Sequence, residues 1–223
     1  GIGQPLQGSQ LRFGDGSAED WVGRIEGLTP AESSRVGAAI HSVRAVPLPD
    51  ADLVAAAAKQ HDWPLHMHLS EQRVENEQCL QVYGRTPTRV LSDVGALTVN
   101  STAVHATHLT GDDVSLLATS GAGVCLCPTT ERDLADGIGP AGSLATQGVS
   151  LSLGSDSHAV IDLIEEARAV ETHERLATNR RGRFEAPTLL RAATVDGHRA
   201  LGWPDAGTIT VGDRQATEFR PVG

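Results

Sequence analysis

The chain has 223 residues, of which 39% are hydrophobic and 3% aromatic, so it is long enough for one α/β domain with an aliphatic core. Its formal net charge of -10 argues against a nucleic-acid-binding surface, which needs clustered lysine and arginine. We predict neither a signal peptide nor a membrane span, because the sequence has no apolar run of about 18 or more residues.

The first half of the chain alternates apolar extended runs with helical patterns. An alanine-rich run after Pro49 predicts a helix, Gly84 stops a later helix, and Pro87 suits the first turn of the next one. The predicted elements are a loop over 1–20, a helix start at 30–35, strands at 36–43 and 63–70, and helices at 49–62, 71–84 and 86–95.

The second half continues the same alternation. Its predicted elements are strands at 101–108, 122–128 and 148–157, helices at 110–121 and 160–178, a short helix before the last strand, two closing helices within 186–201, and a small β segment over 206–219. Five strands that each precede a helical pattern predict a parallel sheet built of βα units.

Histidines and acids gather where these predicted strands end. Ligands bind at the carboxyl ends of parallel strands, both in barrels and in open sheets, and no glycine fingerprint for a dinucleotide follows the first strand. Alternate residues of a strand share a face, so His66 and His68 of "HMHLSEQ" point the same way. The strand-end residues are His41, His66, His68, His105, His108 and Asp156.

Neutral imidazole and carboxylate suit a divalent cation such as zinc. A bound metal makes hydroxide available near neutral pH, and a nearby carboxylate such as Glu71 can then carry a proton to a leaving group. His105 could bind the metal or polarise the water or substrate, and Asp156 could bind the metal or orient its hydroxide. The structural alternatives are an acid in a helix N-terminal turn for Glu71 and a helix cap for Asp156.

Other candidates for the site are weaker. His108 begins a loop, and we interpret it as structural; His158 is interpreted as a surface residue or one behind the ligands. Cys125 and Cys127 lie on one side of a strand and are interpreted as small core residues, with metal binding as the alternative. Three cysteines in a domain of this size argue against a disulfide framework and favour a reducing cytoplasm.

The motifs "HMHLSEQ", "VHATH" and "LGSDSH", in this order, resemble the amidohydrolase superfamily, in particular its deaminase branch. "HSVRAV", "PTTERDLADGI" and "GSDSHAVIDLIEEAR" look most like segments of formimidoylglutamate deiminases. The resemblance implies His68 and Asp156 as metal ligands, Glu71 as the proton shuttle, and His105 beside the attacking water. It also implies that His41 and Arg44 grip the glutamyl part of the substrate, and arginine suits a carboxylate.

The implied reaction hydrolyses N-formimino-L-glutamate to N-formyl-L-glutamate and ammonia, in the histidine degradation pathway. The resemblance implies a TIM-like (β/α)₈ metal-dependent hydrolase with zinc or another divalent metal, iron included, and a small-molecule substrate. We expect a cytoplasmic homo-oligomer, a dimer in particular. The alternatives are another deaminase of the branch, acting on a purine, pterin or triazine, and an inactive half-barrel remnant. Few aromatic residues are present for stacking on a ring, which favours the aliphatic substrate.

The sequence departs from the family pattern in one respect, because no second H-x-H lies upstream of His66. We therefore expect a partial barrel over 1–202, carrying about the last five βα units, and the remnant of a small β domain over 203–223. The metal site would be incomplete in this chain, and the chain alone would be weakly active at best.

Overall fold

The computed structural model describes residue 2 and residues 4–211. Its sheet has five strands in the order β1-β2-β3-β4-β5, and every neighbouring pair is parallel. The predicted run of βα units is therefore confirmed. The strands are β1 Ala38–Ile40, β2 Leu65–Leu69, β3 Ser101–His105, β4 Gly123–Leu126 and β5 Leu151–Leu153.

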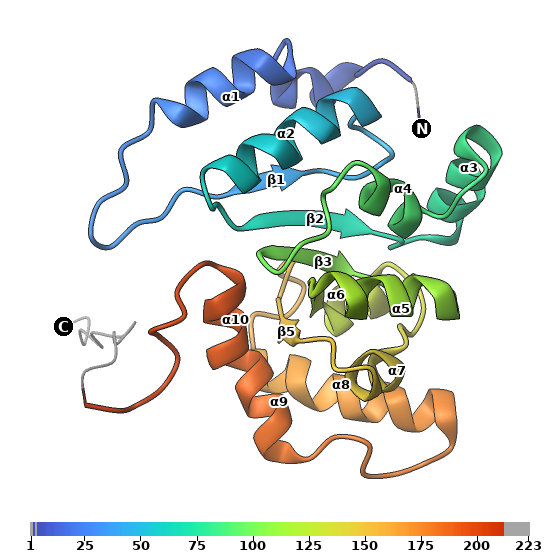
Figure 1. Ribbon diagram of the computed structural model, residues 1–223. Coiled ribbons are helices and arrows are strands. Elements are labelled where there is room, and N and C mark those ends of the chain that lie inside the picture. The colour runs from blue at the N-terminus through green and yellow to red at the C-terminus, as the bar shows by residue number, and fades with distance from the viewer. Residues whose placement is uncertain (1, 3, 212–223) are drawn as a thin grey trace.

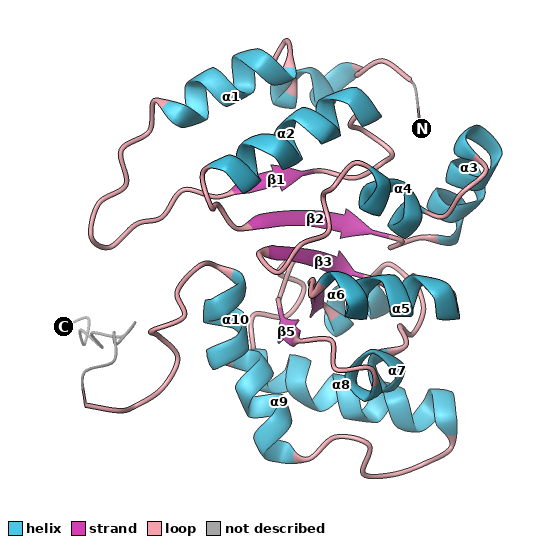
Figure 2. Ribbon diagram, viewed as in Figure 1, coloured by secondary structure: helices cyan, strands magenta, loops and turns pink. Residues whose placement is uncertain are grey.

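Helices connect successive strands and flank both ends of the sheet. In Figure 1, α2 lies beside β1 and α1 packs on the far side of α2, whereas α8, α9 and α10 lie beside β5. Figure 2 shows the same alternation of strands and helices. The helices are the 3-10 helix η1 Gly8–Phe13, α1 Ala18–Glu26, α2 Leu48–Gln60, α3 Arg73–Tyr83, α4 Pro87–Asp93, α5 Gly111–Ser120, α6 Pro128–Asp133, α7 Ala141–Thr146, α8 Leu163–Thr178, α9 Ala186–Ala193 and α10 Val195–Ala200.

Strand β2 shows how the core positions the site. Leu65, Met67 and Leu69 are buried in the core, whereas His66 and His68 on the other face are half-buried. Because side chains alternate along a strand, burial of the aliphatic face aims both histidines away from the core. The predicted common face of the two histidines is thus observed.

Local sequence signals mark where helices begin and end. Thr110 caps α5 by accepting the backbone N–H of Asp113, and the Asp113 carboxylate accepts from the Thr110 N–H in return. Gly121 and Gly84 follow α5 and α3 in the left-handed conformation that glycine adopts without strain.

Three predicted elements were wrong. Residues 30–35 contain no helix; the helix lies upstream at α1, where Ser17 caps the first turn and Trp21 packs against the core. Helix η1 and the start of α1 occupy the predicted loop over 1–20. Two helices, α6 and α7, lie between β4 and β5, where only one short helix was predicted before the last strand.

The small C-terminal β segment is only partly within the described residues. Residues 206–211 contain one bridge residue, Ala206, and no strand, and the remainder of the segment, 212–223, lies outside the described part. The division into units over 1–202 and 203–223 stays a prediction. Within residues 4–211, no helix combines the length and the apolar character needed to cross a bilayer.

The fully buried Leu117 of α5 makes a test of the core. We expect Leu117→Ala to lower the free energy of unfolding by about 2–5 kcal/mol, because it removes buried methyl groups and leaves a cavity. Leu176→Ala in α8 is the matched control, since Leu176 is 73% exposed, and its change should stay within about 0.5 kcal/mol. Urea unfolding measures both, and equal destabilisation would contradict the assigned core.

Candidate metal and proton-transfer site

The site lies at the carboxyl ends of β2, β3 and β5. His68 is the fourth residue of β2, His105 ends β3, and Asp156 follows β5 by three residues. Nitrogen and oxygen atoms of these three side chains lie within 4.8 Å of one another, a group that could hold a metal ion. The two imidazole rings are stacked, with centroids 5.6 Å apart. The structure thus brings the three residues together, and their role as ligands stays a prediction.

Each imidazole is oriented by a hydrogen bond at Nδ1. The His68 Nδ1–H donates to the backbone carbonyl of His41 at 2.6 Å, which leaves Nε2 of His68 as the ring's free nitrogen. His105 lies with Nδ1 3.4 Å from Oε1 of Glu131. Its Nε2 is buried without a hydrogen-bond partner among the described residues, 3.7 Å from Oε1 of Glu71 and 3.9 Å from Oδ2 of Asp156.

A buried nitrogen without a partner is costly, so the space beside Nε2 of His105 suits a bound group. The donor set, two imidazoles and a carboxylate, is the chemistry that a divalent metal such as zinc prefers. The residues present therefore fit a divalent metal.

Charges around His105 set its protonation. Burial lowers the pKa of His105, but the hydrogen bond to Glu131 and the negative charges of Glu71, Glu131 and Asp156 outweigh it, so this pKa stands above its ordinary value. In the absence of a metal the ring therefore binds a proton more readily than a free histidine.

The backbone of the site is strained. His105, Ala106 and Asp156 have φ angles of 71°, 52° and 38°, and Ser70 after β2 has 50°. Residues other than glycine rarely adopt this left-handed region, and such strain concentrates at functional sites. The strand ends are thus turned so that their side chains converge.

Glu71 is held at the site by Glu75. The buried Glu75 carboxylate accepts the backbone N–H groups of Ser70 and Glu71 at 3.2 and 3.1 Å. Burial raises the pKa of Glu75, against the opposing charge of Arg44. This contact fixes the turn between β2 and α3, so the buried Glu71 carboxylate lies beside Nε2 of His105.

The two residues predicted to bind substrate adjoin the cluster. The Arg44 guanidinium pairs with Oε2 of Glu71 at 2.5 Å and donates to Oε1 of Gln72 at 3.4 Å. The His41 ring lies 5.0 Å from the ring of His68. Burial and then the neighbouring charges of His68 and Arg44 lower the pKa of His41.

Other sequence candidates lie away from the cluster or make other contacts. His66 bonds through Nε2 to the backbone carbonyl of Ala200 at 2.8 Å, and His158 is exposed. The backbone carbonyl of His108 accepts a hydrogen bond from the Asn76 side-chain amide at 2.6 Å. Cys125 and Cys127 form no disulfide, and both sulfurs lie close to Gly154.

The sequence analysis assigned no role to Glu131, although this residue lies in the quoted segment "PTTERDLADGI". The side chain is buried in α6, contacts His105, and accepts the backbone N–H of Cys127 at 3.0 Å. A signal existed: Pro128 opens a helix directly after β4, which places an acid of its first turns near the strand end. An acid there is also common as a helix-terminal residue, so the pattern alone could not assign it.

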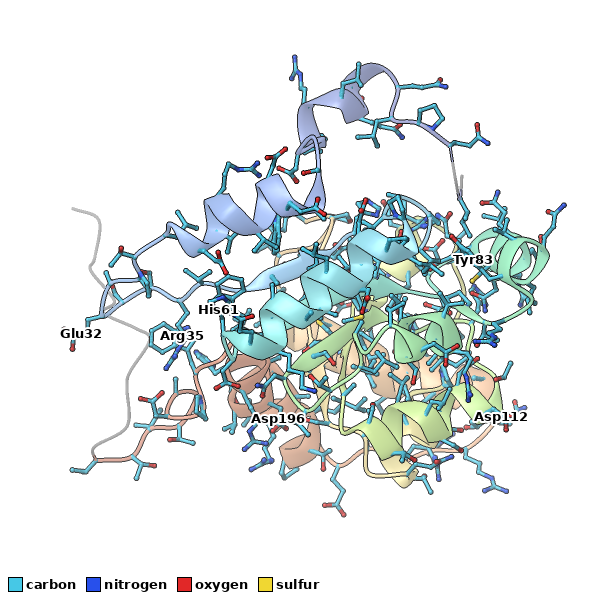
Figure 3. The ribbon with its side chains drawn as sticks, turned by 45° about the horizontal axis from the view of Figure 1, so that its top comes forward. Glu32, Arg35, His61, Tyr83, Asp112 and Asp196 are labelled. Carbon is cyan, nitrogen blue, oxygen red and sulfur yellow. The ribbon has the colours of Figure 1, made fainter. Side chains whose placement is uncertain are left out.

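A separate groove lies at the amino ends of the strands. Its walls include Trp63, Ser101, Gly123 and Trp203. Arg35 lies over the Trp203 ring at 4.4 Å, and Figure 3 shows Arg35 and His61 on this side of the molecule. The group of His68, His105 and Asp156, whose ligand atoms lie close enough to hold a metal, is at the opposite strand ends, so we place the site there and not in this groove.

The fold and the cluster together define a parallel α/β protein with imidazoles and carboxylates converging at the carboxyl ends of its strands. The chain belongs to the Amidohydrolase family, whose sequence model matches residues 14–214. The predicted resemblance to the amidohydrolase superfamily is thereby confirmed.

Individual relatives are deaminases and a deiminase. The chain is 37% identical over 221 residues to a formimidoylglutamate deiminase of Pseudomonas aeruginosa, covering 95% of this chain and 48% of that protein. It is 33% identical over 160 residues to a 5-methylthioadenosine/S-adenosylhomocysteine deaminase of Nitratidesulfovibrio vulgaris, covering 70% and 36%. The chain thus spans half or less of the length of these relatives.

Solved structures agree with the fold. An adenosine deaminase from Xanthomonas campestris with bound zinc matches with a TM-score of 0.81 and 30% identity, over 87% of this chain and 46% of that one. The predicted fold class, strand–helix units of a TIM-like hydrolase barrel, is confirmed, and the matched part covers about half of that neighbour.

Proposed function

We propose that the protein containing this chain is a metal-dependent deiminase that converts N-formimino-L-glutamate and water to N-formyl-L-glutamate and ammonia. The observation that carries the proposal is the position of Arg44, whose guanidinium reaches the Glu71 carboxylate beside the His68, His105 and Asp156 cluster. A cation at the edge of a hydrolytic cluster suits a substrate that carries carboxylates. The similarity to a formimidoylglutamate deiminase supports the same substrate.

The proposed roles follow from the contacts. His68 and Asp156 would hold zinc or another divalent metal such as iron, with His105 beside them. Such a metal, when bound, lowers the pKa of water towards about 7, which provides the nucleophile. Glu71 would accept a proton from the attacking water and deliver it to the leaving nitrogen, while His105 would lie beside that water and orient it by accepting a hydrogen bond at Nε2.

In this reaction the water oxygen bonds to the formimino carbon, and the bond from that carbon to the terminal nitrogen breaks. The nitrogen leaves as ammonia and the carbon keeps a carbonyl oxygen, so the products balance. Arg44 and His41 would orient the glutamyl part. Arg44 must then leave or share its contact with Glu71 when the substrate carboxylate arrives.

A purine deaminase is the second candidate, because a 5-methylthioadenosine/S-adenosylhomocysteine deaminase is also similar to this chain. A purine ring needs a stacking partner, and at the described cluster the ring contacts are between histidines: His68 with His41 and with His105. The two tryptophans at the described groove, Trp63 and Trp203, lie at the other strand ends. These observations favour the aliphatic substrate.

The assay uses the purified protein that contains these 223 residues, supplied with Zn²⁺. Ammonia and N-formyl-L-glutamate are measured with N-formimino-L-glutamate as substrate, and ammonia alone with S-adenosylhomocysteine, 5-methylthioadenosine and adenosine. We expect turnover of the formimino compound only. Turnover of a purine nucleoside instead would replace the proposal by the second candidate, and no turnover of any would favour the inactive remnant.

We also propose a cytoplasmic dimer. All three cysteines are free, two of them buried, which agrees with a reducing compartment. Sedimentation of the purified protein tests the oligomeric state, and a monomer at micromolar concentration would contradict the dimer.

A further inference from the structure

Glu131 meets His105 at the nitrogen that faces away from the cluster. Its Oε1 lies 3.4 Å from Nδ1 of His105, whereas Glu71 and Asp156 face Nε2 of the same ring. Both His105 and Glu131 are buried, so water competes little for the contact. One imidazole therefore lies between an acid on one side and the candidate metal site on the other.

The oxygen that faces His105 must be an acceptor. Oε1 of Glu131 also accepts the backbone N–H of Cys127 at 3.0 Å, and an oxygen that accepts this N–H is not the one that carries a proton. The contact with His105 is then donated by the ring, so Nδ1 carries the hydrogen. In the neutral ring this leaves a bare lone pair on Nε2.

Glu131 is itself firmly placed. It lies in α6, and Thr129 of the same helix donates its backbone N–H to the buried Glu166 of α8 at 3.0 Å. The Glu131 backbone N–H closes a turn on the Cys127 carbonyl at 3.0 Å. Two contacts thus hold the backbone at the start of α6. The Cys127 N–H holds the Glu131 carboxylate itself, so this acid cannot follow a rotating imidazole without losing that hydrogen bond.

The second imidazole is fixed in the same way. His68 donates Nδ1–H to the His41 carbonyl, which can only accept, so His68 also presents Nε2. Both histidines therefore offer the same nitrogen to the space beside Asp156, one held by a carbonyl and the other by an acid. A metal-binding imidazole is commonly oriented by such an acceptor behind it.

We propose that Glu131 is a positioning residue that fixes His105 with Nδ1 protonated and Nε2 directed, unprotonated, at the candidate metal site. The proposal rests on the proposed function only in assigning that site to hydrolysis. Glu131 lies outside the cluster of His68, His105 and Asp156, and it acts on the site through the imidazole of His105.

The test is ¹⁵N NMR of the histidine rings in the metal-free protein at a pH where His105 is neutral, with a His105→Asn variant to assign its signals. We expect the Nδ1–H form of His105 in the wild type. Glu131→Ala removes the acceptor, so both tautomers should appear and Zn²⁺ affinity, measured by calorimetry, should fall by about 10–100-fold. Glu131→Gln keeps an acceptor oxygen, so the tautomer should persist and the affinity should fall less.

Asp133→Asn is the matched control, because Asp133 is an exposed acid on the same helix, and it should change neither measurement. A wild-type His105 protonated on Nε2 would overturn the proposal even if Glu131→Ala does not fold. An unchanged tautomer and Zn²⁺ affinity in a folded Glu131→Ala would overturn it as well. Neither readout needs the substrate, so loss of the proposed deiminase activity would leave this inference intact.

Discussion

We expect Glu71→Gln to lower the rate of ammonia release from N-formimino-L-glutamate by about 10²–10⁴-fold, the usual contribution of a positioned acid–base group. The amide keeps the size of the side chain but cannot carry a proton between water and the leaving nitrogen. Because Glu71 faces Nε2 of His105 at 3.7 Å and is not among the three clustered residues, the metal content should stay unchanged. Steady-state kinetics and elemental analysis of the same sample measure both.

Glu77→Gln is the control for this variant. Glu77 is exposed on α3, the helix that follows Glu71, and the change removes one negative charge as well. Its rate should match the wild type. Equal rates for Glu71→Gln and Glu77→Gln would end the case for Glu71 as proton shuttle, and a loss of metal in Glu71→Gln would reassign it as a ligand.

The second large effect concerns His68. We expect His68→Ala to weaken Zn²⁺ binding by at least about 100-fold, because it removes a ring whose free nitrogen faces His105 and Asp156, a larger loss than removing a supporting contact. Calorimetric titration of the metal-free protein with Zn²⁺ measures the affinity without any substrate.

His66→Ala offers a control two residues away on the same face of β2. His66 bonds to the Ala200 carbonyl at the end of α10, so its loss should loosen that helix and leave Zn²⁺ affinity unchanged. A fall of similar size in both variants would indicate a general disturbance of β2. Unchanged affinity in His68→Ala would show that the metal, if bound, is held elsewhere.

Much of the fold could be predicted because its signals are local. The alternation of Leu65, Met67 and Leu69 with two histidines indicates a strand with one buried face, and Gly84 marks a helix end. Helix α1 was missed because its apolar residues, such as Trp21, lie beyond a stretch rich in glycine and serine that is typical of a loop. The helical structure of that segment is determined by tertiary packing and not by the local sequence pattern.

The site was predictable only where it depends on strand ends. His68, His105 and Asp156 end or follow strands, so parallel pairing alone brings them to one edge. The contact between Arg44 and Glu71 depends on the shape of two loops, and that between Glu131 and His105 depends on how α6 turns back over β4. These two contacts could not be predicted from the pattern of residues along the chain.

The left-handed backbone at His105, Ala106 and Asp156 has a consequence for engineering this protein. Glycine at Ala106 would relieve unfavourable torsion angles, yet it would also free the hinge on which the imidazole of His105 depends. A change that relieves this strain would therefore be expected to stabilise the fold and loosen the candidate site, so thermostability and the proposed activity would be opposed at these strand ends.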